Sequence, residues 1–199
     1  MPRRYRMAAR GQAVQETRQR IIDAAISLHD QRGVIATNWE EIAQEAGVST
    51  ATVYRHFPSL DELVPACART AFEAGARLPT PQQAAAAFAR LPRPAQRMER
   101  LIRESCRCYG LGAGWLDAAR REAKSVPALD RAVRLQDRAL GILIRAALGN
   151  VALDAQTMQV VKALIDFPFW KALIDAGIPK DKAPEVINDL VQSRLEKRR

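Results

Sequence analysis

The sequence lacks several features that would assign it to a common class of protein. It has no run of about 18 apolar residues, the length that a membrane-spanning helix needs, and no signal-peptide pattern. Cysteine is scarce, and Cys67, Cys106 and Cys108 are an odd number without metal-ligand spacing. We therefore expect a soluble, cytoplasmic protein with ordinary buried thiols and no membrane role. A thiol-reactive sensor at Cys106 and Cys108 is the alternative.

Catalytic motifs are also missing. The chain has no Gly-rich phosphate loop followed by Lys-Ser or Lys-Thr, no His-Glu-x-x-His and no Gly-x-Ser-x-Gly. Neither His29 nor His56 has an evident nucleophile or metal partner nearby in sequence. Acidic residues of the C-terminal part lie at helical spacing from arginines, as Glu104 does from Arg100, and such pairs are typical of a solvated helix face. We expect no enzymatic activity, no cofactor and no metal site.

Alternating strand patterns are absent, helical periodicity dominates, and Gly and Pro fall between periodic segments, which predicts an all-α protein. We expect an N-terminal three-helix domain followed by a larger C-terminal helical domain. The predicted divisions are a basic flexible arm at 1–13, the N-terminal domain with its linking helix at 14–78, and the helical body at 79–199. Outside the helix-turn-helix itself, the expected helices cover residues 14–32, 60–76, 82–90, 94–110, 115–124, 127–148, 154–176 and 180–199.

Two short helices hinged on a glycine are predicted within residues 37–57. Gly47 can adopt the positive φ that a tight turn needs, and Val53 fills the gap where the helices cross. Asn38 and Ser49 stand where side-chain oxygens can cap the two helices. This pattern indicates a DNA-reading helix-turn-helix.

A helical wheel over the second of these helices turns Val53 and Phe57 inward. The side chains left on the outer face are candidates for the major groove: Ala51, Thr52, Tyr54 and Arg55. Small and hydroxyl side chains read bases through single hydrogen bonds and thymine methyl contacts, so weak specificity per half-site is expected. Arg55 suits a guanine or a phosphate, whereas the flanking Tyr54 and His56 suit phosphate oxygens.

The net charge of +9 is unevenly distributed. Residues 1–20 contain six arginines and one glutamate, whereas residues 21–78 contain four arginines and eight acids, so the helix-turn-helix itself is not basic. The arm at 1–13 therefore offers salt-dependent attraction to DNA that the core lacks. A solvating tail without DNA contacts is the alternative interpretation.

From Glu16 to about Leu63 the sequence resembles the TetR family of bacterial transcriptional regulators. The resemblance is carried by Ala46-Gly47-Val48-Ser49 and by the run Thr52-Val-Tyr-Arg-His-Phe-Pro-Ser59. It implies DNA contacts for Thr37, Thr50, Ala51, Tyr54 and His56. With the outer-face residues and the two capping residues, the predicted DNA-binding set is Thr37, Asn38, Ser49, Thr50, Ala51, Thr52, Tyr54, Arg55 and His56.

Two positions depart from the family pattern. Leu60 stands where many members have a lysine that binds phosphate, so one backbone anchor is missing. Trp39 replaces a small aliphatic residue or a base-reading arginine. Because Trp39 forms an i, i+3, i+4, i+7 stripe with Ile42, Ala43 and Ala46, it is interpreted as a core residue, with packing against the DNA backbone as the alternative.

The C-terminal body is expected to provide both a dimer interface and a ligand pocket. The helix at 154–176, which Pro168 should kink, has apolar residues on more than one face and is expected to pair with the final helix in a four-helix interface between two subunits. The resemblance implies the same arrangement, with the two recognition helices one duplex turn apart. The aromatic stretch 166–170 is read as part of this interface, or otherwise as pocket lining. Candidates for the pocket lining are Phe88, Met98, Ile102, Cys106, Tyr109 and Trp115.

Gly110, Gly112 and Gly114 loosen the helix before Trp115, which marks either a ligand entry or a plain bend with Trp115 in the core. The mostly apolar candidates favour a hydrophobic effector, while the excess of arginine leaves an acidic effector open. The sequence thus predicts a homodimeric repressor that binds a palindromic operator and is released by a small molecule. The alternatives are an effector-independent regulator or activator, and a helical protein-interaction module that no longer reads DNA.

Overall fold

The computed structural model describes residues 2–71 and 79–196, and the side chains of residues 11–70 and 79–196. Within these ranges the regular elements are all helices, so the predicted all-α class is confirmed. The helices are α1 (Pro2–Arg32), α2 (Trp39–Ala46), α3 (Thr50–His56), α4 (Leu60–Ala71), α5 (Pro81–Ala87), α6 (Pro94–Leu111), α7 (Ala113–Glu122), α8 (Pro127–Leu148), α9 (Ala155–Ile165), α10 (Phe167–Asp175) and α11 (Ala183–Glu196). Among the helices described, none is long and apolar enough to span a membrane.

Contacts group the chain into two compact units. Residues 1–74 and 117–133 form the first unit, and residues 75–116 and 134–199 form the second. This grouping differs from the boundary expected near residue 78, because the ends of α7 and α8 that flank residue 125 join the N-terminal helices. Each of these two helices therefore begins in one unit and ends in the other.

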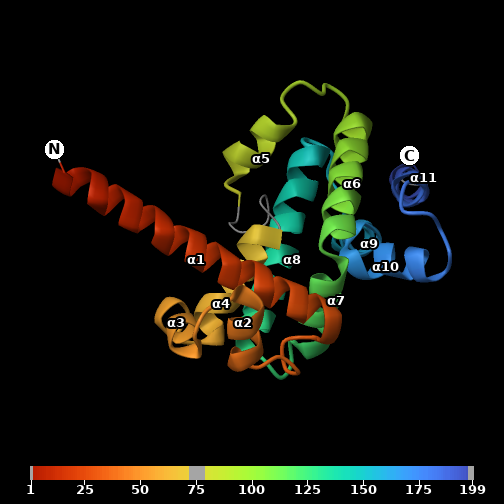
Figure 1. Ribbon diagram of the computed structural model, residues 1–199. Coiled ribbons are helices and arrows are strands. Elements are labelled where there is room, and N and C mark those ends of the chain that lie inside the picture. The colour runs from red at the N-terminus through yellow and green to blue at the C-terminus, as the bar shows by residue number, and fades with distance from the viewer. Residues whose placement is uncertain (1, 72–78, 197–199) are drawn as a thin grey trace. The chain divides into compact units, whose positions relative to one another are not determined.

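In the first unit, α1 packs against α2 and α4, and α2 packs against α3 (Figure 1). Apolar side chains from the four helices form its core, and the following are fully buried: Ile21, Ala25, Val53, Phe57, Leu63 and Val64. Burial of a side chain such as Ile or Phe contributes about 1.5–3 kcal/mol. The packing of α1 against α2 and α4 thus holds the helix-turn-helix on a rigid support.

The helix ends in this unit follow the predicted local chemistry. Asn38 Oδ1 accepts a hydrogen bond of 2.9 Å from Glu41 N–H, and Glu41 Oε2 accepts one of 3.0 Å from Asn38 N–H, which completes a capping box. Gly47 ends α2 in the left-handed region at φ 64°. Ser49 Oγ accepts the N–H of Thr52 at 3.2 Å and so caps α3. The two predicted caps and the glycine hinge are confirmed.

The start of the first helix was predicted incorrectly. It was expected near residue 14, but α1 begins at Pro2. Proline is well suited to the first turn of a helix, and the alanines at 8 and 9 have high helix propensity, so the basic segment continues the helix in place of a coil. The predicted end of the fourth helix, near residue 76, lies outside the described residues.

In the second unit, α10 and α11 pack against α6 and α9 (Figure 1). The helix expected at 154–176 is divided at Asp166, which has an extended backbone (φ −70°, ψ 157°) and caps both α9 and α10. Pro168 lies in the first turn of α10, where its missing N–H costs no helical hydrogen bond. The expected kink is therefore a complete break between two helices.

Candidate nucleic-acid interface

Helix α3 presents one side to the core and the opposite side to solvent. Val53 and the following Phe57 are fully buried, whereas Tyr54 is 46% exposed. Ser49, Ala51 and Arg55 are exposed, and Thr50, Thr52 and His56 are half-buried. The predicted DNA-binding residues of this helix thus share one accessible edge, which we call the α3 edge and define as residues 49–56 without Val53.

The hydroxyl groups of Ser49 and Thr52 on the α3 edge are already hydrogen-bonded within the chain. Ser49 Oγ lies 2.9 Å from Thr52 Oγ1, and Arg55 Nη2 donates a bond of 3.4 Å to the same threonine oxygen. These contacts orient Thr52 and Arg55 with respect to each other. Arg55 retains most of its five N–H donors for a partner outside the chain.

Thr37 and Asn38 lie in the turn between α1 and α2. The Thr37 hydroxyl donates a hydrogen bond of 2.7 Å to the carbonyl oxygen of Gly33, and the Thr37 N–H donates one of 3.2 Å to the carbonyl oxygen of Val34. Asn38 is exposed, and its side chain is engaged in the capping box of α2. Both predicted contact residues are therefore held by their own turn.

Trp39 connects this turn to the α3 edge. Its ring centroid lies 5.2 Å from that of Tyr54, with 36° between the ring planes. Whereas Ile42 and Ala43 are buried, Trp39 is only half-buried. The interpretation of Trp39 as an ordinary core residue was therefore wrong, because its ring packs on an exposed tyrosine of the neighbouring helix.

Two arginines of α1 brace the ends of the helix-turn-helix, and the sequence interpretation missed both. Arg18 Nη1 donates a hydrogen bond of 2.9 Å to the carbonyl oxygen of His56, and its guanidinium carbon lies 4.0 Å from the centre of the Phe57 ring. Arg20 Nη1 donates one of 3.0 Å to the carbonyl oxygen of Ala46. A cation at the C-terminal end of a helix satisfies free carbonyls and is favoured by the helix dipole. In the sequence these arginines could only be counted as part of a basic segment.

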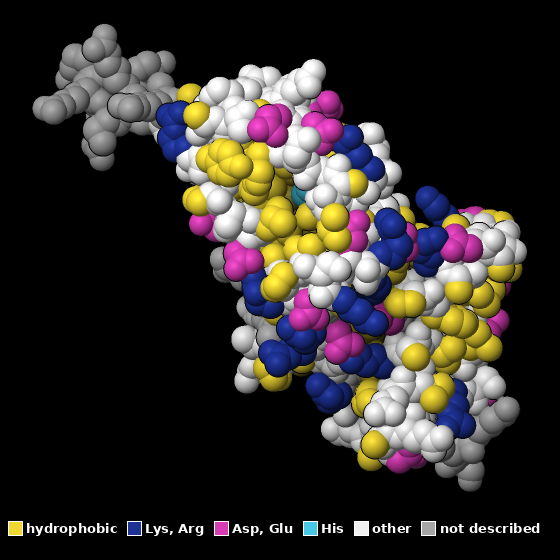
Figure 2. Space-filling model, turned by 90° about the horizontal axis from the view of Figure 1, so that it is seen from below, with side chains coloured by type: hydrophobic (Ala, Val, Ile, Leu, Met, Phe, Trp, Pro, Cys, Tyr) yellow, Lys and Arg dark blue, Asp and Glu magenta, His cyan; other side chains and the backbone are white. Residues whose placement is uncertain are grey.

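Neighbouring groups determine the charge state of His56 on the α3 edge. Partial burial, and then the charges of Arg18 and Arg55, lower the pKa of His56, which favours a neutral imidazole near pH 7. Figure 2 shows that basic and acidic side chains are interspersed over the face in view, with no single large basic patch. A neutral His56 can thus both donate and accept a hydrogen bond.

Comparison with known proteins agrees with this geometry. Residues 21–67 match the family described as bacterial regulatory proteins, tetR family. That range contains the core-facing part of α1, both helices of the helix-turn-helix and the start of α4.

The N-terminal domain of this chain thus matches the TetR family. Over 52 residues it is 46% identical to the HTH-type transcriptional regulator AcrR of Shigella flexneri, an alignment that covers 26% of this chain and only 24% of that relative. The sequence likeness to this relative is thus confined to about a quarter of each chain.

Similarity to solved structures extends over the C-terminal helices as well. A TetR-family member from Streptomyces coelicolor A3 is 27% identical, covers 87% of this chain and 97% of its own, and superposes with a TM-score of 0.63. The multidrug binding protein EbrR, solved in complex with proflavin, is 27% identical, with 87% and 99% of the chains covered and a TM-score of 0.53. The TetR-family fold therefore applies to both units of this chain.

The residues predicted to line a ligand pocket are all buried. Phe88, Met98, Ile102, Cys106, Tyr109 and Trp115 each expose 6% of their surface or less. Tyr109 packs against Phe167 and Trp170, with ring centroids 5.7 and 5.9 Å away, and its hydroxyl donates a hydrogen bond of 3.1 Å to Ile165 O. Phe167 and Trp170 thus contribute to the interior of the second unit, and Trp115 is a core residue beside the glycine-rich bend.

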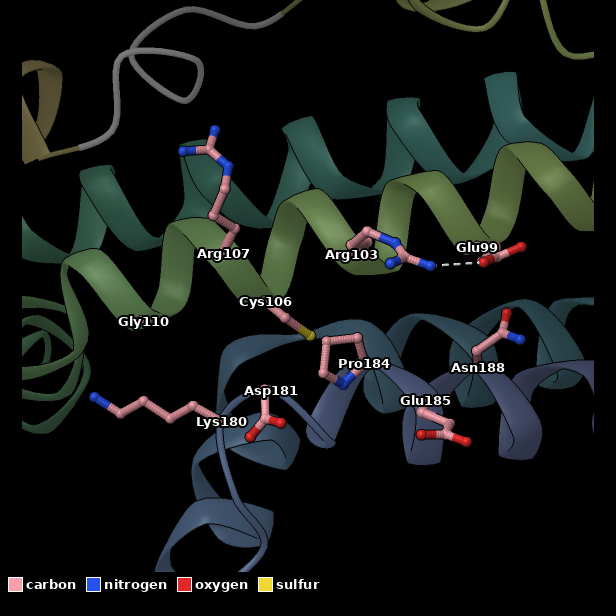
Figure 3. Close-up of a pocket in the computed structure, with 10 residues that line it drawn as sticks. All are labelled: Glu99, Arg103, Cys106, Arg107, Gly110, Lys180, Asp181, Pro184, Glu185 and Asn188. Atoms are coloured by element: carbon pink, nitrogen blue, oxygen red, sulfur yellow. Dashed lines mark hydrogen bonds and ion pairs between the residues drawn. The ribbon is translucent and has the colours of Figure 1, made fainter.

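A groove lined by six charged residues among others lies between α6 and α11 and its preceding loop. It has a volume of about 680 Å³ and is lined by Glu99, Arg103, Cys106, Arg107, Gly110, Lys180, Asp181, Pro184, Glu185 and Asn188. Figure 3 shows the Cys106 sulfur directed between the two helices beside Pro184, and the ion pair between Glu99 and Arg103. Of the six predicted pocket residues, only Cys106 lines this groove, because the others pack into the core.

The thiols are poorly suited to act as sensors. Burial raises the pKa of Cys67 and of Cys106 to about 12, and burial also raises the pKa of Cys108. The thiolate is the reactive form of cysteine, so these side chains are held in the unreactive thiol form near neutral pH. This agrees with the expectation of ordinary buried or half-buried thiols.

Proposed function

We propose that this chain is a homodimeric transcriptional repressor that binds a palindromic operator through the α3 edge and is released by a small-molecule effector. The observation that supports the proposal most is the α3 edge itself, on which Tyr54 and Arg55 point away from a fully packed core. A recognition helix docks in the major groove through such an exposed face.

The residues of the interface have distinct roles in this proposal. Thr50, Ala51 and Thr52 contact base edges, where hydroxyls form single hydrogen bonds and methyl groups pack on thymine. Arg55 binds a guanine or a phosphate, and Tyr54, His56, Thr37 and Asn38 bind phosphate oxygens. Ser49 serves mainly by capping α3.

Charge attraction is assigned to the basic arm at 1–13. The segment 21–78 carries four basic and eight acidic residues, so it disfavours a polyanion on balance. Four of the arginines in residues 1–20 lie within the arm. The affinity for DNA should therefore decrease steeply with salt, by a slope of about 0.9 in log K per phosphate contact.

Dimerisation is assigned to α9, α10 and α11. Val160 is 36% exposed and Leu190 is 43% exposed, while Phe169, Leu173 and Leu195 remain half-buried in the single chain. Apolar side chains left accessible on adjacent helices are the usual basis of an isologous dimer interface. A dimer places two α3 edges about 34–36 Å apart, as one duplex turn requires.

Release by an effector is supported by the similarity to EbrR, a multidrug binding protein solved with proflavin. In the proposed mechanism the effector binds in the second unit near Met98, Ile102, Tyr109 and Trp115, shifts α4 and changes the spacing of the two α3 edges. Because these side chains are buried, binding requires local rearrangement. To convert a mostly bound population to a mostly free one, the effector must favour the released form by about 5.5 kcal/mol.

Selection of random duplexes by the purified chain tests the DNA-binding part. We expect enrichment of a palindrome, and Tyr54→Ala should weaken binding to it by at least about tenfold, since tyrosine supplies a phosphate contact. Leu111→Ala is the matched control, because Leu111 is also exposed but lies outside the first unit. If no palindrome is enriched, or if Tyr54→Ala binds like the control, the protein-interaction module becomes the better interpretation.

Sedimentation of Leu190→Glu tests the dimer. A charge in the proposed interface should convert the dimer to a monomer and abolish cooperative binding to the full palindrome, whereas Leu111→Glu should remain dimeric. A dimeric Leu190→Glu variant would show that another surface forms the interface.

A thermal-shift screen of planar cationic, apolar and acidic small molecules tests for the effector. If no compound of any class raises the unfolding temperature, an effector-independent regulator becomes the better interpretation.

A further inference from the structure

Glu122, the last residue of α7, binds the turn between α1 and α2. Its Oε2 atom accepts a hydrogen bond of 2.8 Å from the backbone N–H of Val34 and one of 2.9 Å from that of Ile35. All three residues belong to the first unit, although 88 positions separate Val34 from Glu122. One carboxylate oxygen therefore holds two successive amides of a loop from a remote part of the chain.

The placement of this carboxylate is unfavourable for α7 alone. A negative charge at the C-terminal end of a helix opposes the helix dipole, and the preceding Arg120 and Arg121 are the residue type that this position favours. The two charge-assisted hydrogen bonds to the turn offset this cost. The carboxylate of Glu122 is thus stabilised by its hydrogen bonds to the turn, and not by its position in α7.

The turn is shaped to receive the carboxylate. Gly33 has φ 91°, and a Cβ atom built on it would lie 1.9 Å from Glu122 Oε1. The absence of a side chain at position 33 is therefore needed for two reasons, the backbone conformation and the space occupied by Glu122. Any larger residue here would displace the carboxylate.

The atoms fixed by Glu122 lead directly to the predicted DNA contacts. Val34, whose N–H binds Glu122, accepts the N–H of Thr37 through its carbonyl oxygen, and Gly33 accepts the Thr37 hydroxyl. Thr37 precedes Asn38, the cap of α2. The carboxylate, the turn and Thr37 therefore form one continuous hydrogen-bonded series, and Asn38 follows Thr37 directly in the chain.

We infer that Glu122 is a positioning residue for DNA binding, which acts by holding the 33–38 turn so that Thr37 and Asn38 meet the phosphate backbone. The inference rests on the proposed function. It adds a determinant from α7, outside the helix-turn-helix and without any contact to DNA of its own.

Loss of the negative charge of Glu122 and loss of its hydrogen bonds should change the DNA affinity in opposite directions. Removing a carboxylate from the first unit should by itself strengthen binding to a polyanion. Glu122→Ala should nevertheless weaken operator binding by about tenfold, because the two amides lose their acceptor and the turn loses its fixed geometry. Glu122→Gln should bind at least as well as the unmodified protein, since its amide oxygen can accept the same hydrogen bonds without the charge.

Glu45→Ala is the matched control. Glu45 is an exposed residue of α2 in the same unit, so this substitution removes the same charge without touching the turn. It should bind DNA as tightly as the unmodified protein or more tightly. All affinities are measured at a temperature where circular dichroism shows each variant to be folded, so that a lower stability does not mimic a loss of binding.

A double-mutant cycle then tests whether Glu122 affects DNA binding through Thr37. The effects of Glu122→Ala and Thr37→Ala should not add, because both remove the same contact, whereas Glu122→Ala and Tyr54→Ala should add. Binding of Glu122→Ala at the level of Glu45→Ala, or full additivity with Thr37→Ala, would overturn the inference while leaving the proposed function intact.

Hydrogen exchange of the Val34 and Ile35 amides measures their hydrogen bonds to Glu122 without DNA. Both should exchange faster in Glu122→Ala than in Glu45→Ala. Equal exchange rates of these amides in Glu122→Ala and Glu45→Ala would contradict the inference, whatever the DNA measurements show. If the unmodified protein selects no operator, by contrast, that result counts against the proposed function itself.

Discussion

Trp39 and Tyr54 form a tilted aromatic pair that joins the first and second helices of the helix-turn-helix on their solvent side. Their ring centroids are 5.2 Å apart, and Tyr54 is the large exposed side chain of the α3 edge. The tryptophan thereby limits the positions available to a tyrosine that is proposed to bind DNA.

Removal of Trp39 should lower both stability and DNA affinity. An aromatic pair contributes about 0.5–1.5 kcal/mol beyond the area it buries. Urea unfolding of Trp39→Ala, Tyr54→Ala and the double variant should therefore give a coupling free energy of this size. Trp39→Phe keeps a ring in place and should retain most of the coupling. Strictly additive unfolding free energies would show that the two rings do not stabilise each other.

Gly47→Ala should destabilise the protein through backbone strain alone. Gly47 has φ 64°, and a Cβ atom there would meet only Arg20 Nη1 at 3.6 Å, an ordinary contact. The left-handed conformation costs a residue with a side chain about 1–2 kcal/mol, and asparagine less. We expect chemical denaturation to rank Gly47→Ala below Gly47→Asn. A Gly47→Asn variant less stable than Gly47→Ala would point to a steric cause, since asparagine is the larger side chain.

Arg97 should be among the most important polar residues of the second unit. Its guanidinium donates to the carbonyl oxygens of Ala147 at 2.7 Å, Leu91 at 3.1 Å, Pro92 at 2.9 Å and Leu148 at 3.4 Å. It thus joins the end of α8 to the loop before α6. Arg97→Lys keeps the charge but not the planar set of donors, so thermal unfolding should show a loss of about 2–3 kcal/mol.

Arg103→Ala provides the control for this experiment. Arg103 is exposed and pairs with Glu99 at 2.8 Å on the surface of the same helix. Such an exposed pair contributes about 0.5 kcal/mol or less. If Arg97→Lys were as stable as Arg103→Ala, the four carbonyl contacts would have no net energetic value.

Acid should destabilise the first unit through His29. The side chain is 1% exposed, its Nδ1 atom has no hydrogen-bond partner among the residues that the structure describes, and burial lowers its pKa from 6.5 to about 4. Between these values the unfolded chain binds a proton that the folded chain does not. Stability is therefore fully present above pH 6.5 and is lost as pH falls toward 4, by about 3 kcal/mol in total.

Comparison of the unmodified protein with His29→Gln separates this effect from the titration of carboxylates. Glutamine does not titrate, so the stability of the variant should fall less between pH 7 and pH 4.5. Parallel pH profiles for the two proteins would show that His29 is able to gain a proton without unfolding.

Within the candidate interface, the sequence predicted what depends on neighbours in the chain. The caps at Asn38 and Ser49, the positive φ of Gly47 and the inward side of α3 follow from interactions over three or four residues. The residues that support the interface could not be predicted in this way. Arg18, Arg20 and Glu122 reach backbone groups that are 38, 26 and 88 positions away. Their sequence contexts resemble those of ordinary surface charges.

In the C-terminal helices, too, local features could be predicted from the sequence and long-range contacts could not. The sequence predicted a kink at Pro168, close to the break at Asp166, and the start of α8 at Pro127, but it assigned to a ligand pocket several apolar side chains that the structure packs into the core. Periodicity shows that a side chain lies on an apolar face, and only the arrangement of the other helices decides whether that face meets a cavity, a core or a partner.

The amino-acid sequence by itself determined the helical class, the helix-turn-helix and its outward side, because helix ends, turns and amphipathic faces are set by local backbone and side-chain chemistry. The tertiary structure alone decided that Trp39 packs on Tyr54, that Glu122 holds the turn before α2 and that charged residues of α6 and of the segment 180–188 surround the groove beside Cys106. Such contacts depend on which helix surfaces meet, and that is fixed by packing of the whole chain at once.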